Sequence, residues 1–148
     1  MFKKLLVTVL CMMGLCTNDL IANNSYQSID TPVSQSVKLL KHDERRDYPI
    51  TIVLRRTGCA FCAKDRKIIV PRVKAMRTEG QIVYVFDVKQ MSSSQLKYIK
   101  SNFKGVLYHN KIPTPTVFVA MPRKNHHSWK ITEKCNNGDL AQIKKLLN

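Results

Sequence analysis

Short apolar runs rich in β-branched residues, separated by helix-like segments, constrain the fold of this 148-residue chain more than any other feature. The runs cover residues 50–54 (ITIVL), 82–88 (IVYVFDV) and 116–120 (TVFVA). Each run has the length and composition of a buried β-strand. Strands that are joined through helices have to pair in parallel, so this alternation predicts an α/β fold.

Apolar residues at helical spacing predict the segments that connect these strands. Helices are expected over residues 34–46, 59–77 and 92–103, with a last helix starting at Asn137-Gly138. Ile69, Val73 and Met76 recur at the spacing of the buried face of the second helix. Pro71 lies inside that helix and is expected to kink or split it, because proline lacks a backbone N–H.

The remaining segments complete one domain. A turn over residues 122–127 separates the third run from a fourth strand, residues 128–132, which is expected to pair antiparallel with it. Residues 34–148 are therefore expected to form a mixed four-stranded sheet flanked by helices. The polar segment 23–33 is interpreted as a linker.

Two cysteines three residues apart, Cys59 and Cys62, lie in RRTGCAFCAKDRK at the end of the first strand and the start of a helix. Open α/β sheets place their active sites at the carboxyl ends of strands. A helix N-terminus favours negative charge and lowers the pKa of a thiol there. Residues i and i+3 of a helix share a face, so Cys62 can close a disulfide with Cys59. Nearby basic side chains are expected to stabilise the thiolate further: Arg55, Arg56 and Lys64.

Other interpretations of the pair are a structural disulfide or a metal site. A second C-x-x-C is missing, so zinc would need ligands from outside the chain. His126 and His127 could complete a copper site, although adjacent histidines in a turn are more often solvated. The prediction is therefore a redox pair without metal or cofactor. A third thiol, Cys135, is expected to be buried or idle rather than redox-active.

The run IPTPTVFVA places Pro113 and Pro115 directly before the third strand, with Thr114 between them. Proline cannot donate to a sheet, so it suits the first residue of a strand or an edge. The bond before proline is also the one peptide bond that readily becomes cis. A cis-proline packed beside the two cysteines would keep the preceding backbone open for an extended substrate.

The order of strand, C-x-x-C helix, strand, helix, T-P-T before a hairpin, and last helix resembles the thioredoxin superfamily, especially its exported thiol:disulfide interchange members. This resemblance implies that Cys59 is the nucleophile and Cys62 the resolving cysteine. It also implies that Pro115 is the cis-proline and that the backbone of Thr114 meets the substrate. The substrate-contacting residues are thus expected to be Thr114, Pro115, Ala60 and Phe61.

The chain departs from thioredoxins proper at three points of this pattern, the last of which is the absence of a proline between the two cysteines. Gly58 stands where they usually have tryptophan. Val53 stands where they carry a buried carboxylate, six residues before the nucleophilic cysteine. The second departure leaves no obvious proton acceptor for Cys62, and a cytosolic thioredoxin role does not follow.

Residues 1–22 are typical of an export signal. Lys3 and Lys4 precede an apolar run over residues 5–16, which is too short to span a bilayer as a helix. Cleavage is expected after Ala22, with lipidation or an uncleaved N-terminal anchor as alternatives. The protein is therefore expected to be exported, and periplasmic in a Gram-negative bacterium.

The formal net charge of +15 predicts polyanionic partners. An exported chain seldom meets nucleic acid, so an anionic membrane surface or an acidic protein is the expected partner.

These observations predict an exported thiol:disulfide oxidoreductase that acts on client proteins with disulfides or thiols and exchanges electrons with a redox partner protein. A reductase or isomerase is favoured over an oxidase. The alternatives are a non-enzymatic assembly module of an envelope or secretion complex, and a copper-handling protein.

Overall fold

A four-stranded mixed sheet forms the centre of the molecule. The computed structural model describes residues 24–124, 128–136 and 139–148. The strands are β1 (Ile50–Arg55), β2 (Val83–Asp87), β3 (Thr116–Pro122) and β4 (Trp129–Asn136), in the spatial order β2-β1-β3-β4. β1 pairs in parallel with β2, and β3 pairs antiparallel with both β1 and β4. The predicted mixed four-stranded sheet is thereby confirmed.

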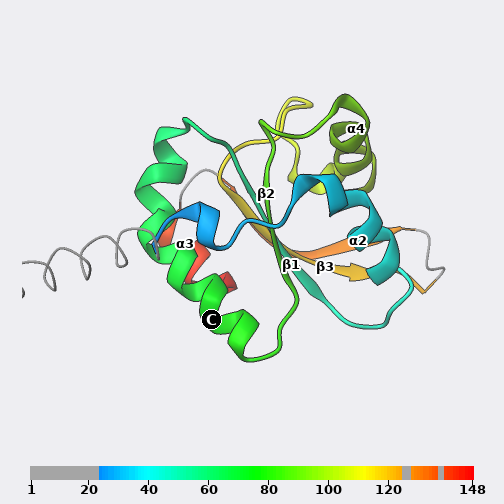
Figure 1. Cartoon of the computed structure of the whole chain (residues 1–148). Helices are drawn as coiled ribbons and strands as arrows, with labels where there is room; N and C mark the ends of the chain where they lie inside the picture. The colour runs from blue at the N-terminus through cyan, green and yellow to red at the C-terminus, as the bar shows by residue number, and fades with distance from the viewer. Residues whose placement is uncertain (1–23, 125–127, 137–138) are drawn as a thin grey trace, which may run out of the picture.

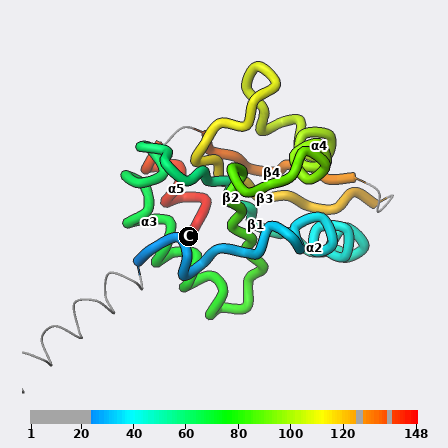
Figure 2. The backbone as a smooth tube through the Cα atoms, turned by 45° about the horizontal axis from the view of Figure 1, so that its top comes forward, coloured from blue at the N-terminus to red at the C-terminus, as the bar shows by residue number. Residues whose placement is uncertain are grey.

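Helices cover both faces of this sheet (Figures 1 and 2). They are α2 (Ser36–Asp43), α3 (Ala60–Thr78), α4 (Ser93–Asn102) and α5 (Leu140–Leu146), with short 3-10 helices η1 (Tyr26–Ser28), η2 (Val33–Gln35) and η3 (Lys104–Val106). α3 and α5 pack on one face, and α2 and α4 on the other. No helix in the described part of the chain is both long and apolar enough to cross a bilayer.

β1 is one of the two inner strands, and all six of its residues are buried. Ile52 and Leu54 pack with the side chains of α2 and α4, whereas Val53 packs with those of α3 and α5. Burial of each such side chain stabilises the fold by roughly 1.5–3 kcal/mol. An almost wholly apolar strand is the pattern expected for a strand covered on both faces.

α3 is one continuous helix through Pro71, so of the two predicted effects of this proline, a kink or a split, the split is wrong. Pro71 removes one donor, and the carbonyl of Lys67 therefore loses its partner. Both residues are exposed, so water can satisfy that carbonyl. The predicted buried stripe of Ile69, Val73 and Met76 is confirmed.

β4 extends beyond the predicted strand, from Trp129 to Asn136. Residues 132–134 are polar and exposed, so this edge strand has little apolar pattern to mark its end. Its length is set by pairing with β3, in which Val117 faces Cys135. Cys135 therefore lies within the sheet rather than in a loop before the last helix.

The segment 23–33 was predicted to be a linker, but its described part packs on the domain. Tyr26 and Ile29 are buried in the core between the sheet and α3. The backbone N–H of Thr31 donates to the carbonyl of Val85 at 2.8 Å. Two apolar side chains in a polar segment thus pack into the core, which composition alone did not reveal.

Two predictions on local structure fall on residues that the structure does not describe. The export signal over residues 1–22 and the start of the last helix at Asn137-Gly138 both lie outside the described ranges. Within those ranges, α5 is capped by the carboxylate of Asp139, which accepts from the backbone N–H of Ala141 at 3.0 Å and of Gln142 at 3.2 Å.

Candidate active site

Cys59 lies where β1 ends and α3 begins. Gly58 makes this turn with a φ of +83°, a left-handed conformation that favours glycine, which explains the residue that departs from thioredoxins here. Cys59 is the N-cap of α3, and its backbone N–H donates to the carbonyl of Arg56 at 3.2 Å. The thiol therefore lies at the N-terminus of a 19-residue helix, where unpaired N–H groups favour negative charge.

Groups from α3 and from the start of β3 surround the sulfur of Cys59. The backbone N–H of Cys62 donates to this sulfur at 3.3 Å, and the hydroxyl of Thr114 donates to it at 3.5 Å. The carbonyl oxygen of Thr114 lies 3.3 Å from the same sulfur. The Thr114–Pro115 peptide bond is cis. The structure thus brings together the two cysteines and the Thr114-Pro115 pair that the sequence analysis placed in one site.

The two thiols differ in acidity. Burial raises the pKa of Cys59, but hydrogen bonds from the Cys62 thiol, the Thr114 hydroxyl and the Cys62 backbone outweigh it and hold the pKa below its usual value. Burial, followed by the hydrogen bond to Cys59, raises the pKa of Cys62 to about 12. Near neutral pH, Cys59 is therefore the thiol more readily ionised.

The two thiols also differ in accessibility. Cys59 is partly exposed, whereas Cys62 is 3% exposed. Ala60 and Phe61, which were predicted to contact the substrate, are exposed between the two cysteines, and 59% of Phe61 is open to solvent. An incoming disulfide can approach Cys59 but not Cys62.

Arg55 was expected to stabilise the thiolate, but the structure shows its guanidinium bonded to other groups. Its guanidinium is paired with the carboxylates of Asp30 and Asp87, and the residue is 4% exposed. It also lies over the ring of Tyr26, 5.1 Å from the centroid. Arg55 therefore anchors the loop before Cys59, because Asp87 in turn accepts from the backbone N–H of Thr57 at 3.1 Å.

Asp65 is a buried carboxylate that the sequence analysis missed. It is 0% exposed, and neither carboxylate oxygen has a hydrogen-bond partner within the described residues. Burial raises its pKa, partly opposed by the charge of Lys64. Asp65 follows Cys62 by three residues on α3, so both lie on the buried face of one helical turn.

Tyr26 packs beside these groups. Burial raises its pKa, and the nearby charges of Cys62 and Asp65 raise it further. Its hydroxyl, like the Asp65 carboxylate, is buried without a partner in the described chain. The sequence signal for the buried group of Cys62, Asp65 and Tyr26 was the acidic residue three positions after Cys62. It lies on a helix face otherwise occupied by apolar side chains.

Cys135 is a buried side chain of the same core cluster as Cys62. It is 2% exposed, and its sulfur donates to the carbonyl of Asp139 at 3.5 Å. Burial and the charge of Asp139 raise the pKa of this thiol. These features agree with the buried, unreactive thiol that the sequence analysis favoured.

The described residues contain no group of three His, Cys, Asp or Glu side chains that could hold a metal ion. His126 and His127, considered as copper ligands, lie outside the described residues.

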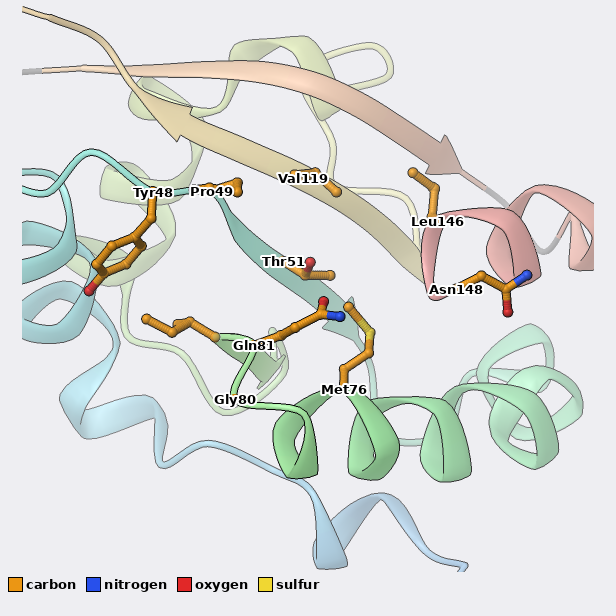
Figure 3. A pocket seen from close by; sticks show the side chains of 10 residues that line it. Tyr48, Pro49, Thr51, Met76, Gly80, Gln81, Val119, Leu146 and Asn148 are labelled. Atoms are coloured by element: carbon orange, nitrogen blue, oxygen red, sulfur yellow. The ribbon is translucent and has the colours of Figure 1, made fainter.

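A cavity of about 530 Å³ lies at the opposite end of the sheet from Cys59 (Figure 3). Its lining includes Thr51 at the start of β1, Met76 of α3 and Leu146 of α5. It contains no thiol, carboxylate side chain or basic side chain, so it is not where thiol chemistry takes place.

Comparisons with solved structures identify the fold. Trichomonas vaginalis thioredoxin is 16% identical and superposes with a TM-score of 0.50 over 80% of this chain and 90% of its own. A protein described as a candidate oxidoreductase with a thioredoxin fold is 12% identical, with a TM-score of 0.51 over 83% of this chain and 97% of its own. No protein-family model and no curated protein matches the sequence. The chain therefore has a thioredoxin-like α/β fold, a mixed four-stranded sheet flanked by helices, with a C-x-x-C pair where β1 meets α3.

Proposed function

We propose that this protein is a thiol:disulfide oxidoreductase that acts on client proteins through Cys59 and Cys62. The observation that carries this proposal is the asymmetry of the pair. Cys59 is accessible, lies at a helix N-terminus and has a lowered pKa, whereas Cys62 is buried and protonated beside it. An attacking thiolate and a reserved second thiol are the two parts that disulfide exchange requires.

In the first step, the Cys59 thiolate attacks one sulfur of a client disulfide. A bond forms between Cys59 and that sulfur, and the client's other sulfur leaves as a thiolate that takes a proton from water. The product is a mixed disulfide between the protein and its client. We infer that the backbone of Thr114 contacts the client chain, and its carbonyl oxygen, 3.3 Å from the Cys59 sulfur, supports this role.

In the second step, Cys62 loses its proton and attacks the Cys59 sulfur. The Cys59–Cys62 disulfide forms, and the remaining client sulfur leaves as a thiol, so the client gains two electrons and two protons in all. We infer that Asp65, on the next turn of α3, accepts the Cys62 proton and passes it to the leaving sulfur. A dithiol redox partner protein then returns the pair to its reduced form.

Replacing Cys62 by serine is expected to trap the first intermediate. The Cys59 thiolate can still attack, but no second thiol is present to release the client, so mixed disulfides should accumulate to near stoichiometric amounts. The measurement is non-reducing electrophoresis with mass spectrometry after mixing the reduced variant with a disulfide-containing protein.

Cys135→Ser is the matched control. It should release its client as the parent protein does. Mixed disulfides that form through Cys135, or none in Cys62→Ser despite a native circular dichroism spectrum, would contradict the proposed order of attack.

Replacing Asp65 by asparagine is expected to slow the second step by roughly a hundredfold near neutral pH, the low end of general-base effects. In the parent protein, the rate should rise with pH as Asp65 ionises and then level off. In Asp65→Asn it should keep rising with hydroxide concentration, because burial, the largest cause of the raised pKa of Cys62, persists in the mixed disulfide. Stopped-flow release of the second client thiol, followed from acidic to alkaline pH, measures this difference.

Folding stability separates this role of Asp65 from a structural defect. Its folded pKa is raised, so at neutral pH, above the ordinary pKa of a carboxyl, the ionised group destabilises the fold, and the penalty fades as pH falls. Asp65→Asn should therefore unfold at higher urea concentration while reacting more slowly. Asp47→Asn, at an exposed carboxylate, is the control. An unchanged pH profile in Asp65→Asn would exclude the proton-acceptor role.

We further propose that the protein is exported and acts as a reductase or isomerase rather than an oxidase. Support for export comes from Lys3, Lys4 and the apolar run that follows them. Support for reduction comes from the hydrogen bonds that lower the Cys59 pKa, since the nearby Arg55 is paired with Asp30 and Asp87. Equilibration of the pair with glutathione measures its potential, and a strongly oxidising value would reverse the assignment.

A further inference from the structure

We propose that the client segment bound beside Cys59 is an extended acidic peptide, held in a basic groove that runs from the thiol toward α4. This inference rests on the proposed function, since it names the class of client on which the Cys59–Cys62 pair acts. It is argued from the lining of two adjoining hollows, from their charge and from the exposed aromatic side chains beside them.

The first hollow contains the reactive thiol. It has a volume of about 170 Å³, and its lining includes Cys59, Cys62, Arg56 and Arg66. The other basic residue on its wall, Arg55, is already neutralised by two carboxylates. Arg56 and Arg66 are exposed, so their charges are available to a bound molecule.

The second hollow lies alongside and has a volume of about 430 Å³. Arg56 lines both hollows and so joins them. Three lysines from separate segments line the second hollow: Lys89 after β2, Lys100 of α4 and Lys111 before β3. Its apolar lining includes Met91, Leu96 and Ile112.

The second hollow also approaches the residue that is expected to meet the client backbone. Ile112 lines it, and Thr114 contacts the Cys59 sulfur two residues later. A peptide whose cysteine reaches Cys59 and whose backbone runs along Thr114 would therefore continue past Ile112 into the lysine-lined hollow. An extended residue spans about 3.3 Å, so a few residues on one side of the reacting cysteine are enough.

The charge of the groove is one-sided. No acidic residue lines either hollow. Asp87, at the end of β2, is 2% exposed and is already bonded to Arg55, Thr57 and the backbone N–H of Lys89. Within the described residues, none of the groove's cations forms an ion pair: the exposed Arg56, Arg66, Lys89 and Lys111, and the half-buried Lys100. Carboxylates on a client would supply the missing partners.

The exposed aromatic side chains favour a protein segment over a free anion. Phe61 and Tyr108 are 59% and 64% exposed, the large apolar side chains most open to solvent in the described chain. Phe61 follows Cys59 by two residues, and Tyr108 pairs with Lys111 in a short bridge. Apolar contacts beside cationic ones suit a peptide with mixed side chains. A concave groove also fits an extended peptide better than it fits a flat membrane surface.

The test uses three synthetic peptides of equal length, each with one central cysteine in a disulfide with thionitrobenzoate. The residues on either side of that cysteine are Asp and Glu, Asn and Gln, or Lys and Arg. The reduced full chain is mixed with each peptide, and thionitrobenzoate release gives the second-order rate constant at low and high salt. We expect the acidic peptide to react about tenfold faster than the neutral one at low salt, as electrostatic steering predicts. High salt should remove most of this preference.

Lys89→Gln/Lys100→Gln/Lys111→Gln should bring the acidic-to-neutral rate ratio close to one. Arg56 is retained in this variant, because it also lines the hollow at Cys59. The matched control, Lys38→Gln/Lys41→Gln/Lys130→Gln, removes the same charge from exposed lysines of α2 and β4 and should keep the preference.

The outcomes distinguish failure of the acidic-peptide groove from failure of the proposed oxidoreductase activity. Equal rates for the three peptides, or equal loss of preference in both triple variants, would overturn the groove and leave the oxidoreductase in place. Release of no thionitrobenzoate, together with preferential binding of the acidic peptide by fluorescence anisotropy, would overturn the oxidoreductase and retain the groove. Unchanged peptide rates in the groove variant, with lost binding to phosphatidylserine vesicles, would assign the surface to membranes and overturn the proposal.

Discussion

Replacing Cys59 by serine is expected to reduce the rate of insulin-disulfide reduction to that of dithiothreitol without protein. The remaining thiol, Cys62, is 3% exposed, and burial, the largest cause of its raised pKa, is still present in the variant, so it can neither reach a client nor readily ionise. A serine hydroxyl at the helix N-terminus does not ionise near neutral pH and cannot replace the thiolate. Turbidity of the precipitating insulin B chain measures the rate.

The fold should survive this substitution, because Cys59 is partly exposed and serine is a good helix N-cap. Circular dichroism and urea unfolding of Cys59→Ser check this point. Full activity in the variant would refute the oxidoreductase. A parent protein that is folded but inactive, with a stable partner in pull-downs, would favour the alternative of an assembly module.

Replacing Arg55 by methionine is expected to lower the free energy of unfolding by about 3–5 kcal/mol, the usual effect of removing one member of a buried ion pair. Asp30 and Asp87 would both lose their cation, and Asp87 is 2% exposed. Such a loss is a large fraction of the roughly 5–15 kcal/mol that stabilises a typical domain. Urea unfolding followed by circular dichroism measures it.

Acid sensitivity gives a second measure of the same contact. Burial raises the pKa of Asp87, but hydrogen bonds from Thr57 and Lys89 and the charge of Arg55 outweigh it, so the folded pKa is lowered. Asp87 therefore adds stability above its unfolded pKa, and this stability is lost as pH falls through the folded pKa. Without Arg55, the folded pKa should rise and acid unfolding should begin at higher pH.

Two further variants make this prediction specific. Arg56→Met, at the exposed neighbouring arginine, should change stability by less than about 0.5 kcal/mol. Arg55→Met/Asp87→Asn should recover part of the loss, because the second substitution removes an unpaired buried charge. An Arg55→Met protein within about 0.5 kcal/mol of the parent would show that the ion pairs do not stabilise this loop.

The strands and the placement of the C-x-x-C pair could be predicted from the sequence because their signals are local. β1 starts at the predicted residue and ends one residue later than predicted. Cys59 and Cys62 are fixed relative to each other by the helical i, i+3 relation, and the N–H of Cys62 does point at the Cys59 sulfur.

The end of β4 and the packing of residues 24–33 could not be predicted in the same way. The outer part of β4 is polar, and its strand conformation comes from pairing with β3. Residues 24–33 are polar except for a few positions, and only the core beneath them shows that Tyr26 and Ile29 are buried. In both segments, a partner distant in the sequence decides the structure.

The sequence by itself determined an α/β sheet, a helix that begins at the first cysteine of a C-x-x-C pair, and a proline directly before β3. Each of these follows from periodicity or capping within a few residues of the chain. Tertiary structure alone decided what surrounds the thiol. Arg55 binds Asp30, 25 residues earlier, instead of the thiolate, and Asp65 is buried beside Tyr26 from another segment. Burial and ion pairing depend on which elements pack together in space. The local sequence around a charged residue therefore does not predict which distant residue it will pair with.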